Sequence, residues 1–455
     1  MNRQKIRKIL FYILPYALFF ADFPKLNLTN LLGVTSMNIE LSALILYLVI
    51  FGLISLPDIW KYLLKSRKNK AIIAAIAFML YISLSVIWSL NKTRGVLTAG
   101  ISWLIFCTII SALELFSKKE SSEKILRNFF RASLAASAIA IVQMALDVFG
   151  VKREVTQLCT GCVYSIFGFP HANGFFAEPQ FFGNIIAIAA ILANYQFVHK
   201  KEKRCLIYSG ILTTTLFLTL SRGAIYSFIL ASIIFGIAEM LNNILQIAKI
   251  AGVSIAAILV AFLLQGAMSQ LSATEDTFAD GIRKPIEQLS LGKIKLEDKT
   301  PPNEQTPAEN QSHFEGYVAQ STDVRTLLSE VSVATWKDHL FFGAGIGGSG
   351  QAIYNKYHDS DSELLPELQQ WGLDTPKIIT QNSYTEVLLE LGIVGATLLA
   401  ATLSSIIAEL KKTKSVLFYA TYAIFGLASI TFFSGITNTI HLYILPALLK
   451  PHKSK

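Results

Sequence analysis

The stretch LTLSRGAIY (residues 218–226) places one arginine, Arg222, between two long apolar segments. A second polar interruption, QNSY (residues 381–384), opens another apolar segment after a long polar stretch. We expect both interruptions on the same side of a bilayer. An arginine at that depth is costly unless something anionic meets it. These two stretches therefore predict a multi-span fold with a functional site at one face.

The composition predicts an all-α polytopic membrane protein. Hydrophobic residues make up 53% of the chain, charged residues 16%, and the mean hydropathy is +0.49. Apolar runs of about 16–22 residues recur, each long enough to cross ~30 Å of hydrocarbon. We predict about twelve transmembrane helices, near 8–23, 41–57, 71–90, 95–116, 129–149, 176–198, 205–221, 223–240, 247–265, 384–408, 415–433 and 436–449. The first run has a basic start but no small-residue cleavage site, so it is read as a span.

The net charge of +9 is explained by membrane orientation and not by nucleic-acid binding. With a cytoplasmic N-terminus, 25 of the 40 lysines and arginines fall in inner segments, and six fall in short outer connections. That asymmetry follows the positive-inside rule. We therefore expect both termini in the cytoplasm and the loop 266–383 in the periplasm. This loop is acidic, with 17 acidic against nine basic residues.

The chain divides into an N-terminal bundle (1–265, about nine helices), the large periplasmic loop (266–383) and C-terminal membrane helices (384–455). The first part of the loop is polar and rich in proline. Its second part has apolar residues at helical spacing from Thr322 to Phe342, which predicts a helix. The loop as a whole is therefore predicted to be partly helical.

Glycines follow that helix, and Gly343, Gly345 and Gly348 match the pattern GxGxxG. A dinucleotide site requires a strand before the glycines and a helix after them. A helix precedes them here, so we predict a tight loop at a helix end. A nest of backbone amides for phosphate is the alternative.

Two residues are candidates for chemistry near the first interruption. Arg222 is either a snorkelling interfacial arginine or a guanidinium fork aimed at a phosphate. Glu178 lies in FFAEPQFF (residues 175–182) and precedes a proline at a helix start. It either stabilises that N-terminus or has a raised pKa suited to a proton acceptor or an ion pair with arginine.

Other candidates have simple structural explanations. Arg325 at the start of the loop helix could be a surface charge, and Gln381, Asn382 and Tyr384 could be ordinary caps of the tenth span. Cys159 and Cys162 form either a structural disulfide or two free thiols.

Several of these pieces together resemble the O-antigen ligase and polymerase superfamily, which contains Wzy-type polysaccharide polymerases and lipopolysaccharide ligases. The resemblance covers roughly residues 175–400, and its pieces are LSRGA (220–224), DVR (323–325), FGAG (342–345), QNSY (381–384) and ELGIVG (390–395). It implies a GT-C-like architecture and metal-independent glycosyl transfer, without cofactor or nucleotide sugar, from an undecaprenyl-diphosphate-linked glycan at the periplasmic face of the inner membrane. In the family, arginines matching Arg222 and Arg325 are thought to bind the lipid diphosphate.

One departure from the family matters. The ligases are similar here but have a histidine, read as the base, where this chain has Gln381. The polymerase branch has a Glu-Pro motif matching Glu178 and Pro179. We therefore expect a polymerase that joins repeat units into O-antigen, capsular or exopolysaccharide, with Glu178, Arg222 and Arg325 catalytic. Sugar positioning is assigned to Gln381, Asn382, Tyr384 and His339, and His339 and His358 are the next candidates for the base.

The alternatives are an O-antigen ligase acting on a lipid A-core acceptor and a lipid-linked sugar transporter. The expected partners are the lipid-linked glycan and membrane lipid. By resemblance alone, a chain-length regulator and a flippase are also expected.

Overall fold

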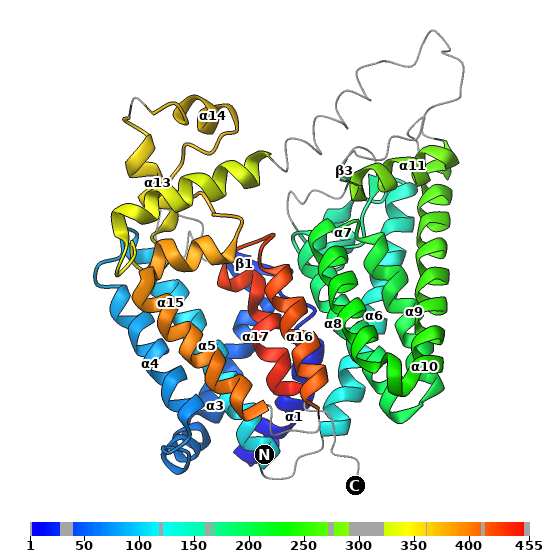
Figure 1. The fold of residues 1–455 in the computed structure, drawn as a ribbon, viewed down its shortest axis with the longest axis horizontal. Helices are drawn as coiled ribbons and strands as arrows, with labels where there is room; N and C mark the ends of the chain where they lie inside the picture. Colours follow the sequence, from blue (N-terminus) through cyan, green and yellow to red (C-terminus); the bar gives the residue numbers. More distant parts are fainter. Residues whose placement is uncertain are drawn as a thin grey trace.

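The computed structural model describes residues 2–27, 40–117, 122–159, 165–166, 169–271, 277–290, 323–360, 362–410 and 415–449. This part is almost entirely α-helical, as predicted (Figure 1). Two small antiparallel sheets accompany the helices. β1 (Lys25–Asn27) pairs with β2 (Glu40–Ser42), and β3 (Ser165–Ile166) pairs with β4 (Phe169–Pro170).

Each predicted apolar segment coincides with a helix. These are α1 (Arg3–Ala17), α3 (Ala43–Lys65), α4 (Lys70–Ser85), α5 (Lys92–Ser117), α6 (Ser122–Val148), α8 (Pro179–Lys200), α9 (Lys203–Leu218), α10 (Arg222–Leu271), α15 (Ser383–Leu410), α16 (Val416–Ser429) and α17 (Ile436–Leu448). The 50-residue α10 contains two predicted segments joined at Asn243, whose backbone is not helical.

Six of these helices are long and apolar enough to cross a membrane: α3, α5, α6, α8, α10 and α15. α4 and α16 are shorter apolar helices. A multi-helix membrane protein is therefore supported. The number of twelve spans, the GT-C-like architecture and the division at residues 265 and 383 stay predictions.

The bundle is organised around α8. Every side chain from Gln180 to Val198 is buried, so this helix has no polar face to expose. It packs against α6, α9, α10, α16 and α17. Some of its polar side chains find partners inside the bundle, for example Asn194, whose Oδ1 accepts from Ser209 Oγ at 2.6 Å. The N-terminal end of α8 is therefore held firmly by its neighbours.

The second part of the large loop forms a small helical layer over one end of the bundle (Figure 1). It contains the helix 323–336, η1 (Lys337–His339), α13 (Ser349–Tyr357) and α14 (Leu365–Gln370). These elements share their own apolar cluster, which includes Leu328, Val331, Ile353 and Leu368. The predicted helix therefore exists, but it ends about six residues earlier than the pattern indicated.

The helix ends early because the following backbone bonds to another helix. α15 is broken at Gly392 (φ 63°, ψ −168°). The amides of Ile393 and Val394 then donate to the carbonyls of Leu340 and Phe341, at 3.0 and 3.1 Å. A Cβ at Gly392 would lie 2.3 Å from the Phe341 carbonyl oxygen, so only glycine fits.

The glycine-rich loop is a tight structural loop, as predicted. Gly343, Gly345 and Gly347 have positive φ. The buried Glu390 carboxylate accepts from the Gly347 amide at 2.8 Å and from the Ser349 hydroxyl at 2.8 Å. An internal carboxylate therefore occupies the amides that the phosphate-nest alternative would have used.

Some charges counted as surface residues in the sequence are buried. Arg7 is fully buried and forms ion pairs with Glu114 at 2.7 Å and Asp58 at 3.3 Å. Arg7, one of the 25 cations counted in the inner segments, is therefore buried in an ion-pair cluster. A buried arginine needs such partners because its unpaired charge would be very costly.

The disulfide alternative is supported for Cys159, which is disulfide-bonded, whereas Cys107 and Cys205 are free. Cys162 lies outside the described residues.

The break in α15 makes a stability prediction. Gly392→Ala should destabilise the protein by about 3 kcal/mol or more, because its backbone region is restricted to glycine and the carbonyl leaves no space. Thermal unfolding of the detergent-solubilised protein measures the effect. Gly426→Ala is the matched control, because nothing lies within 4 Å of its Cβ position inside α16. An unchanged unfolding temperature for Gly392→Ala would contradict this account.

Candidate functional site

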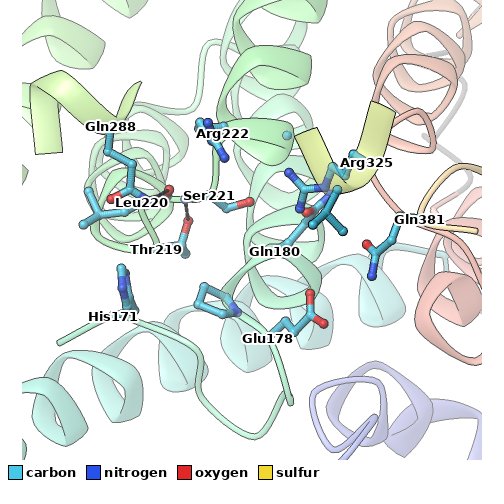
Figure 2. Close-up of a pocket in the computed structure, with 13 residues that line it drawn as sticks. His171, Glu178, Gln180, Thr219, Leu220, Ser221, Arg222, Gln288, Arg325 and Gln381 are labelled. Carbon is cyan, nitrogen blue, oxygen red and sulfur yellow. Dashed lines mark hydrogen bonds between the residues drawn. The ribbon is translucent and has the colours of Figure 1, made fainter. Parts of the chain in front are cut away.

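A cavity of about 440 Å³ opens where α8, α10 and the loop layer meet (Figure 2). It is lined by His171, Glu178, Pro179, Gln180, Thr219, Leu220, Ser221, Arg222, Gly223, Gln288, Val324, Arg325 and Gln381. These residues come from five separate parts of the chain, including α11 (Phe278–Leu289). Its volume lies within the range of ligand-binding pockets.

Four helix N-termini meet at this cavity. α8 begins immediately after Glu178, α10 begins at Arg222, the helix 323–336 begins two residues before Arg325, and α15 begins two residues after Gln381. A helix N-terminus carries partial positive charge and unpaired amides. With two guanidinium groups added, the cavity is electropositive and suited to an anion.

Arg222 is held by the turn between α9 and α10. Leu220 has a left-handed backbone (φ 50°), and the Ser221 carbonyl accepts from the Ile225 amide at 3.0 Å to start α10. Arg222 is only 9% exposed and lines the cavity. It therefore does not reach out to an interface, as a snorkelling arginine would. A cation at a helix N-terminus also opposes the helix dipole, so its position costs stability.

Glu178 precedes α8, but its side chain makes no capping hydrogen bond. The helix-stabilising interpretation of this carboxylate therefore lacks its main contact. Glu178 is open to the cavity, yet the surrounding protein removes enough water to raise its pKa. The positive charge of Arg325 opposes that shift, and the nearby Asp22 adds to it.

The loop before α8 is supported from one side by the segment after α1. Asp22 Oδ2 accepts from the Ala177 amide at 2.8 Å, and the Phe23 amide donates to the Phe175 carbonyl at 3.1 Å. The rings of Phe20 and Phe175 stack with centroids 4.8 Å apart. These contacts fix the backbone next to Glu178.

A buried arginine supports the same loop from the other side. Arg153, in α7 (Arg153–Gln157), is fully buried and pairs with Asp147 of α6. Its guanidinium also donates to the His171 carbonyl at 3.1 Å and to the Asn173 side chain. Because Arg153 is satisfied inside the protein, it is a structural residue and not an outer anchor.

The structure brings together four of the predicted site residues: Glu178, Arg222, Arg325 and Gln381. In Figure 2 the two guanidinium groups lie along one side of the cavity and His171 and Glu178 along the other. Gln381 has a left-handed backbone (φ 58°). Non-glycine residues in this region are strained and often occur at functional sites.

The other predicted residues do not line the cavity. Asn382 Oδ1 accepts from the Tyr384 amide at 2.9 Å, and the Tyr384 hydroxyl donates to the Leu427 carbonyl at 2.8 Å. These are the capping contacts that the simple interpretation expects. His339 lies in η1, roughly 20 Å along the chain from Arg325 at ~1.5 Å per residue. His358 contacts Asp374 at 2.9 Å. Their roles in sugar or proton handling stay predictions.

Sequence reasoning missed several lining residues, among them His171, Gln180, Thr219 and Gln288. Gln180 could have been found, because it lies one residue into the helix that Glu178 precedes. His171 had no comparable signal. Within the described residues, no three His, Cys, Asp or Glu side chains gather as a metal site.

Much of the chain that lines the cavity is similar to a known family. Residues 207–400 match the family model described as O-antigen ligase. This match supports the resemblance to the O-antigen ligase and polymerase superfamily over the segment that it covers. No curated protein and no solved structure matches the chain. The segment shared with the superfamily contains Arg222, Arg325 and Gln381, whereas His171, Glu178 and Gln180 precede it.

The raised pKa of Glu178 predicts a pH-dependent stability difference. In the unfolded chain this carboxyl ionises near its ordinary pKa of 4.5, and in the folded protein only at higher pH. Ionised Glu178 therefore destabilises the folded state above that range. Glu178→Gln should raise the thermal unfolding temperature at pH 7.5 and leave it unchanged below pH 4.5.

The control for this measurement is Glu330→Gln, which changes an exposed carboxylate of the loop helix. A decrease in unfolding temperature for Glu178→Gln at pH 7.5 would show that Glu178 stabilises the fold, contrary to this prediction.

Proposed function

We propose that the protein polymerises undecaprenyl-diphosphate-linked oligosaccharide repeat units into O-antigen, capsular or exopolysaccharide at the periplasmic face of the inner membrane. The observation that carries this proposal is one cavity that combines Arg222, Arg325, four helix N-termini and a single carboxylate. Such a cavity fits a diphosphate leaving group beside a proton acceptor. The match of residues 207–400 to the O-antigen ligase family supports the class of reaction.

In the proposed reaction an acceptor hydroxyl attacks the anomeric carbon of the donor sugar. The bond between that carbon and the diphosphate oxygen breaks, and its electron pair leaves with the diphosphate. Glu178 takes the hydroxyl proton as the new glycosidic bond forms. Arg222 and Arg325 stabilise the negative charge that grows on the leaving group, and they are held in place before the reaction begins.

Glu178 is the preferred base because of its chemistry and its position. Its carboxylate lies in the cavity without a capping hydrogen bond, and its raised pKa brings it closer to that of an effective general base. Gln381 lines the same cavity but cannot accept a proton at neutral pH. That difference favours a polymerase over a ligase that transfers glycan to lipid A-core.

The remaining parts of the proposal rest on the sequence. The distribution of lysine and arginine favours cytoplasmic termini and a periplasmic cavity. A flippase would then have to present the lipid-linked glycan on the outer leaflet. A chain-length regulator is proposed as a second partner.

The first test compares arginine variants in a strain that lacks the protein. Arg222→Ala should abolish the polysaccharide ladder on a gel, leaving single repeat units on the lipid anchor. Each charge-assisted hydrogen bond contributes ~1.5–3 kcal/mol, so removing the guanidinium should slow the reaction by roughly 10–150-fold per bond. Arg222→Lys keeps the charge without the planar fork, and should restore only part of the ladder.

Arg127→Ala is the control, because Arg127 is an exposed residue of α6 outside the cavity. Polymer that forms normally but stays on its lipid carrier in the deletion strain would support the ligase alternative. Accumulation of repeat units on the cytoplasmic face would support the transporter.

A second test concerns the base. Glu178→Gln removes the proton acceptor while preserving shape, so polymer should be lost although the protein is still inserted at the wild-type level. Immunoblotting of membranes checks insertion, and the ladder reports the activity. A normal chain length in this variant would exclude Glu178 as the base.

A further inference from the structure

Two buried side chains of the cavity, His171 and Gln180, have nitrogens whose hydrogen bonding is incomplete within the residues that the structure describes. His171 is 4% exposed and Gln180 is 7% exposed. In the described part of the chain, no hydrogen bond of ordinary geometry is formed by either ring nitrogen of His171. The same is true of the amide nitrogen of Gln180. Leaving a buried polar group unpaired costs ~1–3 kcal/mol. Two such groups lining one cavity indicate that a ligand supplies the partners.

Both side chains are held in place by the protein. The His171 carbonyl accepts from Arg153, and the next amide, that of Ala172, donates to the Leu218 carbonyl at 3.1 Å. The Gln180 amide nitrogen lies against Gly223, where an added Cβ would be only 2.8 Å away. The backbone of His171 is therefore fixed beside the cavity, and the Gln180 side chain is confined by Gly223.

From these contacts we propose that the His171 imidazole and the Gln180 amide form a hydrogen-bonding subsite for hydroxyl groups of the donor sugar, next to its diphosphate. This inference rests on the proposed function and specifies which part of the donor each side of the cavity contacts. The guanidinium groups of Arg222 and Arg325 take the diphosphate. The subsite binds the uncharged sugar that is attached to the diphosphate.

The charge state of His171 supports hydroxyl groups over phosphate as its ligand. Burial, together with the positive charge of Arg153, lowers the pKa of His171 to about 4, although the Thr219 carbonyl beside the ring favours the charged form. The imidazole is therefore uncharged at neutral pH and offers one donor and one acceptor. A sugar hydroxyl also offers a donor and an acceptor, and so does the carboxamide of Gln180.

The polar residues are spread across the cavity, and the Gln180 amide nitrogen lies beside Gly223, the residue after Arg222. The cations lie along one side, while His171 faces them from the other side (Figure 2). Gln180 is one residue into α8, directly after the Glu178-Pro179 pair. A sugar held by His171 and Gln180 would therefore place its anomeric carbon between the diphosphate and the carboxylate.

The test measures binding of two lipids to the purified full-length protein in detergent. One lipid is undecaprenyl diphosphate without sugar, and the other is the lipid-linked repeat unit extracted from the deletion strain. The wild-type protein should bind the repeat unit more tightly. His171→Phe should weaken binding of the repeat unit by roughly 10-fold, about one hydrogen bond, and change binding of bare undecaprenyl diphosphate by less than about two-fold.

Three variants complete the design. Gln180→Met should have the same selective effect as His171→Phe, while His171→Gln should recover part of the affinity because it restores a donor and an acceptor. Gln196→Met is the matched control, since Gln196 is a buried residue of the same helix that does not line the cavity, and its amide nitrogen has no hydrogen-bond partner among the described residues. It should leave both affinities unchanged.

Different failures have different meanings. Equal affinity of the wild-type protein for both lipids, or an equal loss for both in His171→Phe, would overturn the subsite while leaving the diphosphate site intact. Unchanged affinities in both His171→Phe and Gln180→Met would overturn it as well. A wild-type protein that binds neither lipid would contradict the proposed function itself.

Discussion

The break in α15 at Gly392 is the constraint on which the arrangement of the cavity depends. Backbone amides released by the break bond to the carbonyls of Leu340 and Phe341. Two residues before the break, Glu390 binds the glycine-rich loop. Inside an apolar bundle such groups cannot be left unpaired, so the loop and the helix fix each other. The helix 323–336 leads directly into this junction, and its other end carries Arg325 to the cavity.

The cavity itself is built at a cost to stability. Leu220 and Gln381 have left-handed backbones, Arg222 opposes a helix dipole, and Glu178 is an acid without a capping bond. Each of these features is unfavourable alone. The surrounding structure tolerates them because α8 is enclosed on all sides and Arg153 and Asp22 hold the adjacent loop. Such local costs are characteristic of sites preorganised for a ligand.

Prediction from the sequence succeeded where the signal was local. The turn with Arg222 was found because a single charge between two apolar runs has few explanations, and the helix with Arg325 was found from its apolar spacing. Prediction failed where partners came from distant segments. Arg7 was counted only among the cations of the inner segments, although it pairs with Asp58 and Glu114. His171 was overlooked because nothing in its neighbourhood shows that Arg153 and α9 place it in the cavity.

The sequence by itself determined the membrane class, the helical segments and two of the cations, because hydrophobicity and charge act over short stretches of chain. Tertiary structure decided which polar residues meet. Gln381 reaches the cavity, whereas its neighbours Asn382 and Tyr384 cap and brace α15. Three polar positions within four residues cannot be told apart by composition. Their directions depend on a left-handed backbone at Gln381 and on the hydrogen bond from the Tyr384 hydroxyl to Leu427 of α16, and both arise only in the folded chain.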